Sequence, residues 1–158
     1  MTTLPVRLID PRGQRFGAAL SAVTLVGAVA LASVPLVAAV ALALGVSAAL
    51  GMRWFVFGRP WPTVRRLLGL GPPADMEAEL GPRFAQALGA TALALGVGLL
   101  VAGAGPVGWL PVVAVVALQG LLAATGYCLG CRLYGLHWLL PDLFDRFVLR
   151  RRSDVSLS

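Results

Sequence analysis

The sequence has no lysine and no asparagine, and its only isoleucine is Ile9. Charged residues make up 13% of the chain, whereas soluble globular domains contain about 25%. The hydrophobic share of the 158 residues is 58%, and the mean hydropathy is +0.85. Too few polar side chains remain to cover a water-soluble surface, so we expect lipid to solvate most of the chain. All 13 basic residues are arginine, a bias that is typical of a GC-rich bacterial genome.

Charge is absent from two long stretches, residues 16–52 and 84–131. At about 1.5 Å of rise per residue, each stretch is too long to cross a hydrocarbon core of about 30 Å only once. The turn-forming segments 33–35 and 103–108 divide the stretches. The sequence therefore predicts an all-α polytopic membrane protein. Its four transmembrane helices form two tandem hairpins, at about 16–32, 36–52, 84–102 and 109–131. A buried soluble bundle is the alternative, and the shortage of polar residues argues against it.

The distribution of charge predicts the orientation in the membrane. Every arginine and every acidic residue lies before residue 16, between 53 and 83, or after 131. Neither hairpin turn carries a charge, so the positive-inside rule places both turns outside. We therefore expect a multi-pass protein of the bacterial inner (cytoplasmic) membrane, with both termini and the middle loop in the cytoplasm. The N-terminal segment does not resemble a cleaved signal peptide, because the apolar run after Arg15 is too long.

We treat residues 1–158 as a single membrane domain with four parts. These are hairpin 1 (about 10–58), a cytoplasmic loop (about 59–81), hairpin 2 (about 82–135) and a C-terminal amphipathic interfacial helix (about 140–152). Residues 62–70, which also combine apolar and arginine side chains, are predicted to lie on the membrane surface as well.

The two hairpins resemble a repeat. Residues 15–20 and 83–88 share the pattern Arg-Phe-x-x-Ala-Leu, and residues 50–53 (Leu-Gly-Met-Arg) match residues 129–132 (Leu-Gly-Cys-Arg). Both copies enter from the same side, so they would form a parallel pseudo-repeat about an axis along the membrane normal. The alternative is that any two apolar hairpins rich in small residues look alike.

Cys128 and Cys131 are the only cysteines, and they form a C-x-x-C pair. Helical positions three apart share a face, and their Cα atoms lie within the range of about 4.4–6.8 Å that a disulfide needs. At the cytoplasmic end of the fourth span we expect the pair to rest as a reduced dithiol. Arg132 favours a thiolate, whereas lipid burial and the negative end of a helix oppose it. A break at Gly126 and Gly130 would instead leave Cys131 at the start of a new helix.

Three interpretations of the pair stay open. They are redox or sulfur chemistry with Cys128 and Cys131 as the catalytic residues, inert packing in a seam of small residues, and metal binding. Metal binding is the weakest, because two thiols supply half of a tetrahedral site and no motif places Met52, Met76 or His137 to complete it. The sequence has no P-loop, zinc-protease motif or dinucleotide fingerprint, so we expect no cofactor and no metal.

The remaining polar residues of the spans are few. Gln119 lies near the middle of the fourth predicted span, and a buried amide there is expected to face another helix. No ionisable residue lies at that depth, which argues against a proton- or ion-coupled transporter. His137 is expected to be an interfacial side chain. The formal net charge of +6 does not indicate a nucleic-acid partner, because the arginines flank apolar spans instead of forming a groove.

Three motifs in order carry a family resemblance. They are residues 9–16 (Ile-Asp-Pro-Arg, then Arg-Phe), residues 71–86 (Gly-Pro-Pro with acids, then Pro-Arg-Phe-Ala-Gln) and residues 126–131 (Gly-Tyr-Cys-Leu-Gly-Cys). Over residues 9–136 the chain resembles an uncharacterised bacterial membrane family, domain of unknown function 4395. Members of that family look like proteins that occur beside, or fused to, thioredoxin-like and rhodanese-like proteins. The resemblance implies that Cys128 and Cys131 are the family's cysteine pair and that a separate cytoplasmic thiol protein is the partner.

The leading hypothesis is a membrane partner in thiol redox or sulfur relay at the cytoplasmic face, through Cys128 and Cys131. The first alternative is a non-enzymatic assembly or packing subunit with inert cysteines. The second is a passive conduit for a small neutral or sulfur-containing solute. Short spans rich in glycine and alanine also lead us to expect a homo-oligomer in the lipid bilayer.

Overall fold

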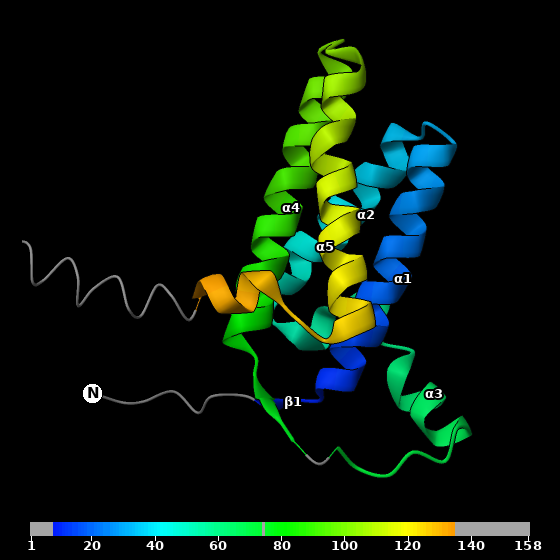
Figure 1. Cartoon of the computed structure of the whole chain (residues 1–158), viewed down its shortest axis with the longest axis vertical. Helices are drawn as coiled ribbons and strands as arrows, with labels where there is room; N and C mark the ends of the chain where they lie inside the picture. The colour runs from blue at the N-terminus through cyan, green and yellow to red at the C-terminus, as the bar shows by residue number, and fades with distance from the viewer. Residues whose placement is uncertain (1–7, 74, 135–158) are drawn as a thin grey trace, which may run out of the picture.

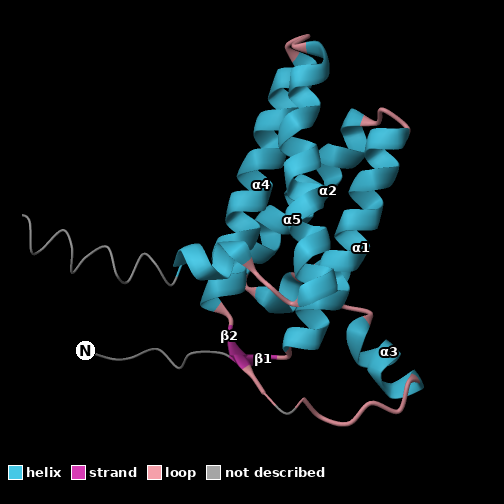
Figure 2. Ribbon diagram, viewed as in Figure 1, coloured by secondary structure: helices cyan, strands magenta, loops and turns pink. Residues whose placement is uncertain are grey.

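The computed structural model describes residues 8–73 and 75–134, in which four long helices form a bundle (Figures 1 and 2). The long helices are α1 (Pro11–Ala30), α2 (Val34–Leu50), α4 (Leu80–Val101) and α5 (Trp109–Thr125). The shorter elements are the helix α3 (Trp61–Leu67), the 3-10 turns η1 (Met52–Trp54), η2 (Val56–Gly58) and η3 (Gly105–Gly108), and the strands β1 (Leu8–Ile9) and β2 (Glu77–Ala78). The predicted all-α class is confirmed, apart from this two-stranded pairing.

Two turns divide the apolar stretches into helical hairpins. α2 begins at Val34 with Pro35 in its first turn, where an N–H would lack an intrahelical partner in any case. α4 ends before Gly103 and Gly105, whose positive φ values of +79° and +56° cannot continue a right-handed helix. The turns of the two hairpins therefore lie at the predicted breaks, residues 33–35 and 103–108.

The two hairpins pack against each other more closely than their own helices pack together. α2 lies mainly on α4, and α1 lies mainly on α5, while the contacts within each hairpin are fewer. Their shared core consists of aliphatic side chains that are fully buried, among them Leu25, Val37, Leu44, Leu93 and Val112. Each of the four long helices contributes to this core, so neither hairpin buries its apolar face alone.

The strands and α3 gather at the end of the bundle opposite the two hairpin turns (Figure 2). β1 pairs antiparallel with β2, with Leu8 opposite Ala78 and Ile9 opposite Glu77. This pairing ties the segment before α1 to the segment before α4. The charged residues of the described ranges also lie in these end segments, which leaves both hairpin turns uncharged.

Among the described residues, two helical segments are long and apolar enough to cross a membrane, Leu80–Val101 and Gly105–Thr125, judged by length and composition. α2 is apolar as well but has 17 residues. Large aliphatic side chains cover much of the outer surface, including Val23 (70% exposed), Leu42 (70%) and Leu110 (66%). An outer surface of this kind is suited to a lipid solvent.

The helix ends differ most from the predicted spans at the start of α1 and at the end of α5. α1 begins at Pro11 instead of residue 16, because the Asp10 side chain caps it by accepting from the Arg12 backbone N–H at 2.9 Å. α5 ends at Thr125 instead of residue 131, because Gly126 adopts a left-handed conformation with φ +75°. The predicted surface segment 62–70 contains the helix α3, whereas the predicted helix at 140–152 and His137 lie outside the described residues.

Candidate functional site

The cysteine pair lies just beyond the end of α5. Residues 126–128 are not helical, and helix resumes at residue 129. The backbone carbonyl of Cys128 accepts from the N–H of Arg132 at 3.1 Å, so Cys128 is the N-cap of this next helical turn. The prediction that the cysteines lie inside the fourth span is therefore wrong, and the alternative of a helix break near Gly126 is the one observed.

Cys128 and Cys131 are joined by a disulfide, with their Cα atoms 5.2 Å apart. The pair was expected to rest reduced, whereas the structure has it closed. The backbone N–H of Cys131 donates to the sulfur of Cys128 at 3.2 Å. Positive helix ends and N–H donors stabilise a thiolate. Once the disulfide opens, this geometry favours charge on the Cys128 sulfur, which reverses the expectation that the pair sits at the negative end of a helix.

A polar pocket of about 280 Å³ lies on one side of the disulfide. Both cysteines line it, together with Gln14, Arg15, Glu77, Tyr127 and Arg132 among others. Arg132, the predicted supporting residue, places its guanidinium 5.5 Å from the centre of the Tyr127 ring. The pocket therefore combines positive charge, a carboxylate and the two sulfurs at the end of the bundle where β1 and β2 pair.

Cys131 is held between the first turns of α1 and α4. The Gln14 amide nitrogen lies 4.0 Å from its sulfur, and Gln14 itself is 7% exposed. From α4, a Cβ placed on Gly81 would come within 3.3 Å of the Cys131 Cβ. A side chain at position 81 would therefore push against the pair, which explains why a glycine fits there.

A second cavity, of about 320 Å³, also borders Cys128 and lies between α1, α4 and α5. Its lining includes the side chains of Gln14, Gln86 and Gln119. These are the only glutamines of the chain, which also has no asparagine, so every side-chain amide lines this one space. We call it the glutamine cavity. The remaining lining is apolar and, within the described residues, carries no charged side chain.

Gln86 is the least satisfied of the three amides. It is 7% exposed, and its carbonyl oxygen is buried without a hydrogen-bond partner among the described residues. A buried amide oxygen left without a donor costs about 1–3 kcal/mol. Sequence reasoning singled out Gln119 and missed Gln14 and Gln86. The available signal was that these are the only other side-chain amides of the chain, one near the start of each apolar stretch.

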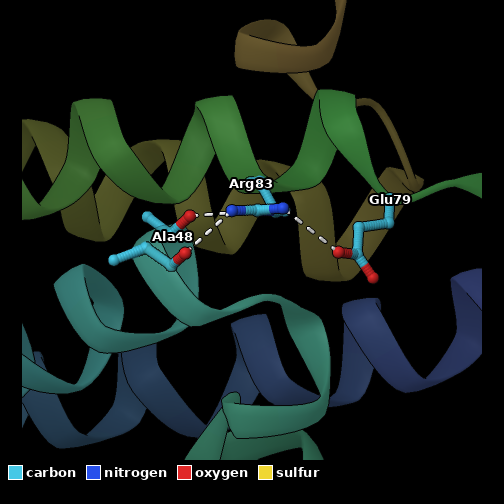
Figure 3. A network of polar contacts seen from close by, with 4 residues as sticks. Ala48, Glu79 and Arg83 are labelled. Atoms are coloured by element: carbon cyan, nitrogen blue, oxygen red, sulfur yellow. Dashed lines mark hydrogen bonds and ion pairs between the residues drawn. The ribbon is translucent and has the colours of Figure 1, made fainter. Parts of the chain in front are cut away.

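Two arginine side chains cap the C-terminal ends of the helices next to this site. Arg83 on α4 donates to the carbonyls of Ala48 and Ala49 at 3.0 and 2.9 Å, and it also pairs with Glu79 at 3.4 Å (Figure 3). These carbonyls belong to the last turn of α2, so a side chain from hairpin 2 caps a helix of hairpin 1.

A side chain of hairpin 1 caps a helix of hairpin 2 in the same way. Arg15 on α1 donates to the carbonyls of Ala123 and Ala124 at 3.1 and 2.9 Å, in the last turn of α5. Both capped turns read Ala-Ala-x-Gly and end in a glycine of positive φ, Gly51 or Gly126. The predicted match of residues 50–53 with 129–132 is therefore wrong in register, because Gly51 corresponds to Gly126 and not to Gly130.

The described residues contain no group of three or more histidine, cysteine, aspartate or glutamate side chains that would hold a metal ion. Met52 and Met76 lie within the described ranges, but neither lines the pockets next to the disulfide, and His137 lies outside those ranges.

The fold and this site define a class: an all-helical chain with two apolar helices long enough to span a membrane and a C-x-x-C pair beyond the last long helix. The chain belongs to the family described as domain of unknown function (DUF4395), whose profile matches residues 9–138. No curated protein and no solved structure matches the chain.

Proposed function

We propose that this protein spans the membrane with four helices and exchanges disulfides with a cytoplasmic thiol protein through Cys128 and Cys131. The single observation that carries the proposal is the position of the disulfide in the wall of the polar pocket, at the charged end of the bundle. A thioredoxin-like protein is the partner whose chemistry fits, and a rhodanese-like protein is the alternative.

The membrane arrangement rests on α4 and α5, which meet the length and composition of spanning helices, and on α1 and α2, which pack against them along the bundle. Residues 16–52 contain no charge, so both helices of hairpin 1 suit the same apolar solvent. The arginines at the end that holds the polar pocket support a cytoplasmic position for that end. The exposed apolar surface also suits a homo-oligomer.

The exchange follows from the environments of the two sulfurs. Cys131 lines the polar pocket but not the glutamine cavity, whereas Cys128 lines both. A thiolate of the reduced partner attacks the Cys131 sulfur, the S–S bond breaks, and Cys128 departs as a thiolate that the Cys131 N–H stabilises. The second thiol of the partner then attacks the mixed disulfide. The partner leaves oxidised and the pair is left as a dithiol.

The test is to trap the mixed disulfide. The probe is a bacterial thioredoxin that keeps only its exposed cysteine, activated as the thionitrobenzoate disulfide. With Cys128→Ser, the Cys131 thiolate should displace thionitrobenzoate and form a stable adduct. With Cys131→Ser, the adduct should form at least tenfold more slowly, because Cys128 is the resolving residue. Release of thionitrobenzoate gives the rate, and a non-reducing gel shows the adduct.

Equal and slow reaction of both variants would contradict the proposal. If oxidant also failed to close the wild-type pair after reduction, the cysteines would be packing residues and the chain an assembly subunit. A membrane-permeant maleimide then offers an independent measure, because inert buried thiols label slowly in the native protein and rapidly after denaturation.

A further inference from the structure

The glutamine cavity has the features of a binding site for a second substrate. Gln86 lines this space, and among the described residues its buried carbonyl oxygen has no hydrogen-bond donor. Gln14 and Gln119 add two further amides to the same lining. A buried polar group without a partner calls for an explanation, and a ligand that binds in the neighbouring cavity is one.

The lining defines the chemistry of that ligand. No charged side chain lines the cavity within the described residues, so a charged ligand would be desolvated without compensation. Leucines at its edge are also part of the exposed apolar surface, including Leu88 (44% exposed) and Leu118 (45%). The ligand is therefore neutral and lipid-soluble, with an apolar body and a polar end that hydrogen-bonds to amides.

An amide side chain can both donate and accept hydrogen bonds without changing its charge. Glutamines therefore suit a ligand whose polar end alternates between carbonyl oxygens, which accept, and hydroxyl groups, which donate. A carboxylate or a guanidinium would match only one of those two states. The three amides therefore suit a ligand that is oxidised and reduced while it is bound in the glutamine cavity.

The position of Cys128 supplies the redox partner. Cys128 lines both the polar pocket and the glutamine cavity, whereas Cys131 lines the polar pocket only. A thiolate on Cys128 is also the one that the local N–H donor stabilises. Electrons that enter through Cys131 can thus leave through Cys128 on the lipid side.

We propose that the glutamine cavity binds the ring of a lipid-soluble quinone, which reoxidises the Cys128–Cys131 dithiol with Gln86 as its hydrogen-bonding residue. The Cys128 thiolate adds to a ring carbon, and Cys131 then attacks the Cys128 sulfur as the S–C bond breaks. An S–S bond forms, and two electrons and two protons pass to the quinone to give the quinol. This inference rests on the proposed function, because the dithiol arises there by exchange with the partner.

Binding is tested first, without chemistry. The full-length double variant Cys128→Ser/Cys131→Ser in lipid nanodiscs should bind decylubiquinone in a calorimetric titration. Adding Gln86→Met, which keeps the length and removes the amide, should raise the dissociation constant about three- to tenfold, the loss expected for one hydrogen bond. Thr91→Val is the matched control on α4: Thr91 is exposed, does not line the cavity, and should leave the constant unchanged.

Stability separates a binding role of Gln86 from a structural one. Since its buried oxygen has no partner among the described residues, Gln86→Met should leave the free energy of unfolding unchanged or raise it while it weakens binding. Loss of stability together with unchanged binding would show a structural role and overturn the assignment.

The redox step is tested on the wild-type chain. After reduction and removal of the reductant, decylubiquinone should consume two thiols for each quinol formed, and Gln86→Met should slow this reaction. No quinone binding, together with normal trapping of thioredoxin by Cys128→Ser, would overturn this inference and leave the proposed function standing. Quinone binding without any thioredoxin adduct would overturn the proposed function instead, and with it the route of the electrons.

Discussion

Two arginine side chains satisfy carbonyls at the C-terminal ends of two helices. The last carbonyls of any helix lack intrahelical donors, so side chains or water must supply them. Arg83 serves α2 and Arg15 serves α5, each through two carbonyl oxygens of the last turn. The guanidinium fork can reach both oxygens together, which a lysine ammonium cannot do as well.

Replacing Arg83 with glutamine should therefore destabilise the protein. Hydrogen bonds from a charged group contribute about 1.5–3 kcal/mol, and the variant loses the charge, two carbonyl contacts and the pair with Glu79. We expect Arg83→Gln to lower the free energy of unfolding by about that amount in a detergent titration. Arg66→Gln is the control, because Arg66 is exposed on α3 and should shift stability by less than about 0.5 kcal/mol. Equal effects of the two variants would show that the contacts to α2 contribute nothing.

At the scale of the helices, the sequence predicted the presence of the four long helices better than the residues at which they begin and end. The breaks near Pro35 and Gly105 were visible because proline and glycine interrupt long apolar runs. The end of α5 was placed six residues too late, at residue 131 instead of Thr125, because apolar residues continue past Gly126. Hydropathy indicates which solvent a segment prefers, but it carries no information on backbone conformation. The left-handed conformation of Gly126, which ends α5, is therefore not visible in it.

The same limit applies to the site. Cys128 and Cys131 stand out by spacing alone, so the sequence located the cysteine pair. The glutamine cavity could not be predicted, because it depends on α5 packing against both α1 and α4. The long helices are apolar on all sides, so their sequences do not indicate which faces meet.

Gly126 offers a direct test of how α5 ends. Its φ of +75° is unfavourable for a residue with a Cβ, so Gly126→Ala should destabilise the fold by about 1–2 kcal/mol. Gly120 on the same helix has nothing within 4 Å of an added Cβ, so Gly120→Ala should stabilise it by about 0.5–1 kcal/mol. The measurement is the free energy of unfolding of the two variants under one set of conditions. A neutral Gly126→Ala would mean that α5 continues into the cysteine pair.

For the whole molecule, the interleaving of the hairpins brings the polar pocket and the glutamine cavity to one disulfide. Arg15 and Gln14 come from α1, Gln86 from α4, and the cysteines from the segment after α5. Since α1 packs on α5 rather than on its own partner, the start of hairpin 1 lies beside the end of hairpin 2. The disulfide therefore borders both a pocket with charged groups and an apolar cavity, which suits the relay between water and lipid that we propose.

The orientation of this arrangement is the last prediction, and it can be tested on intact cells. In a variant with both native cysteines replaced by serine, single cysteines are introduced at Ala104 in the turn of hairpin 2 and at Asp75 in the middle loop. Ala104 lies in an uncharged turn, whereas the loop joins segments that carry Arg65, Arg66 and Arg83. Moving an arginine to the centre of a bilayer costs about 2.5–3.5 kcal/mol, so the loop should stay in the cytoplasm. An impermeant maleimide added outside should then label Ala104→Cys, and it should label Asp75→Cys only after the cells are lysed. The opposite pattern would place the cysteine pair outside the cytoplasm, where no cytoplasmic thioredoxin could reach Cys131.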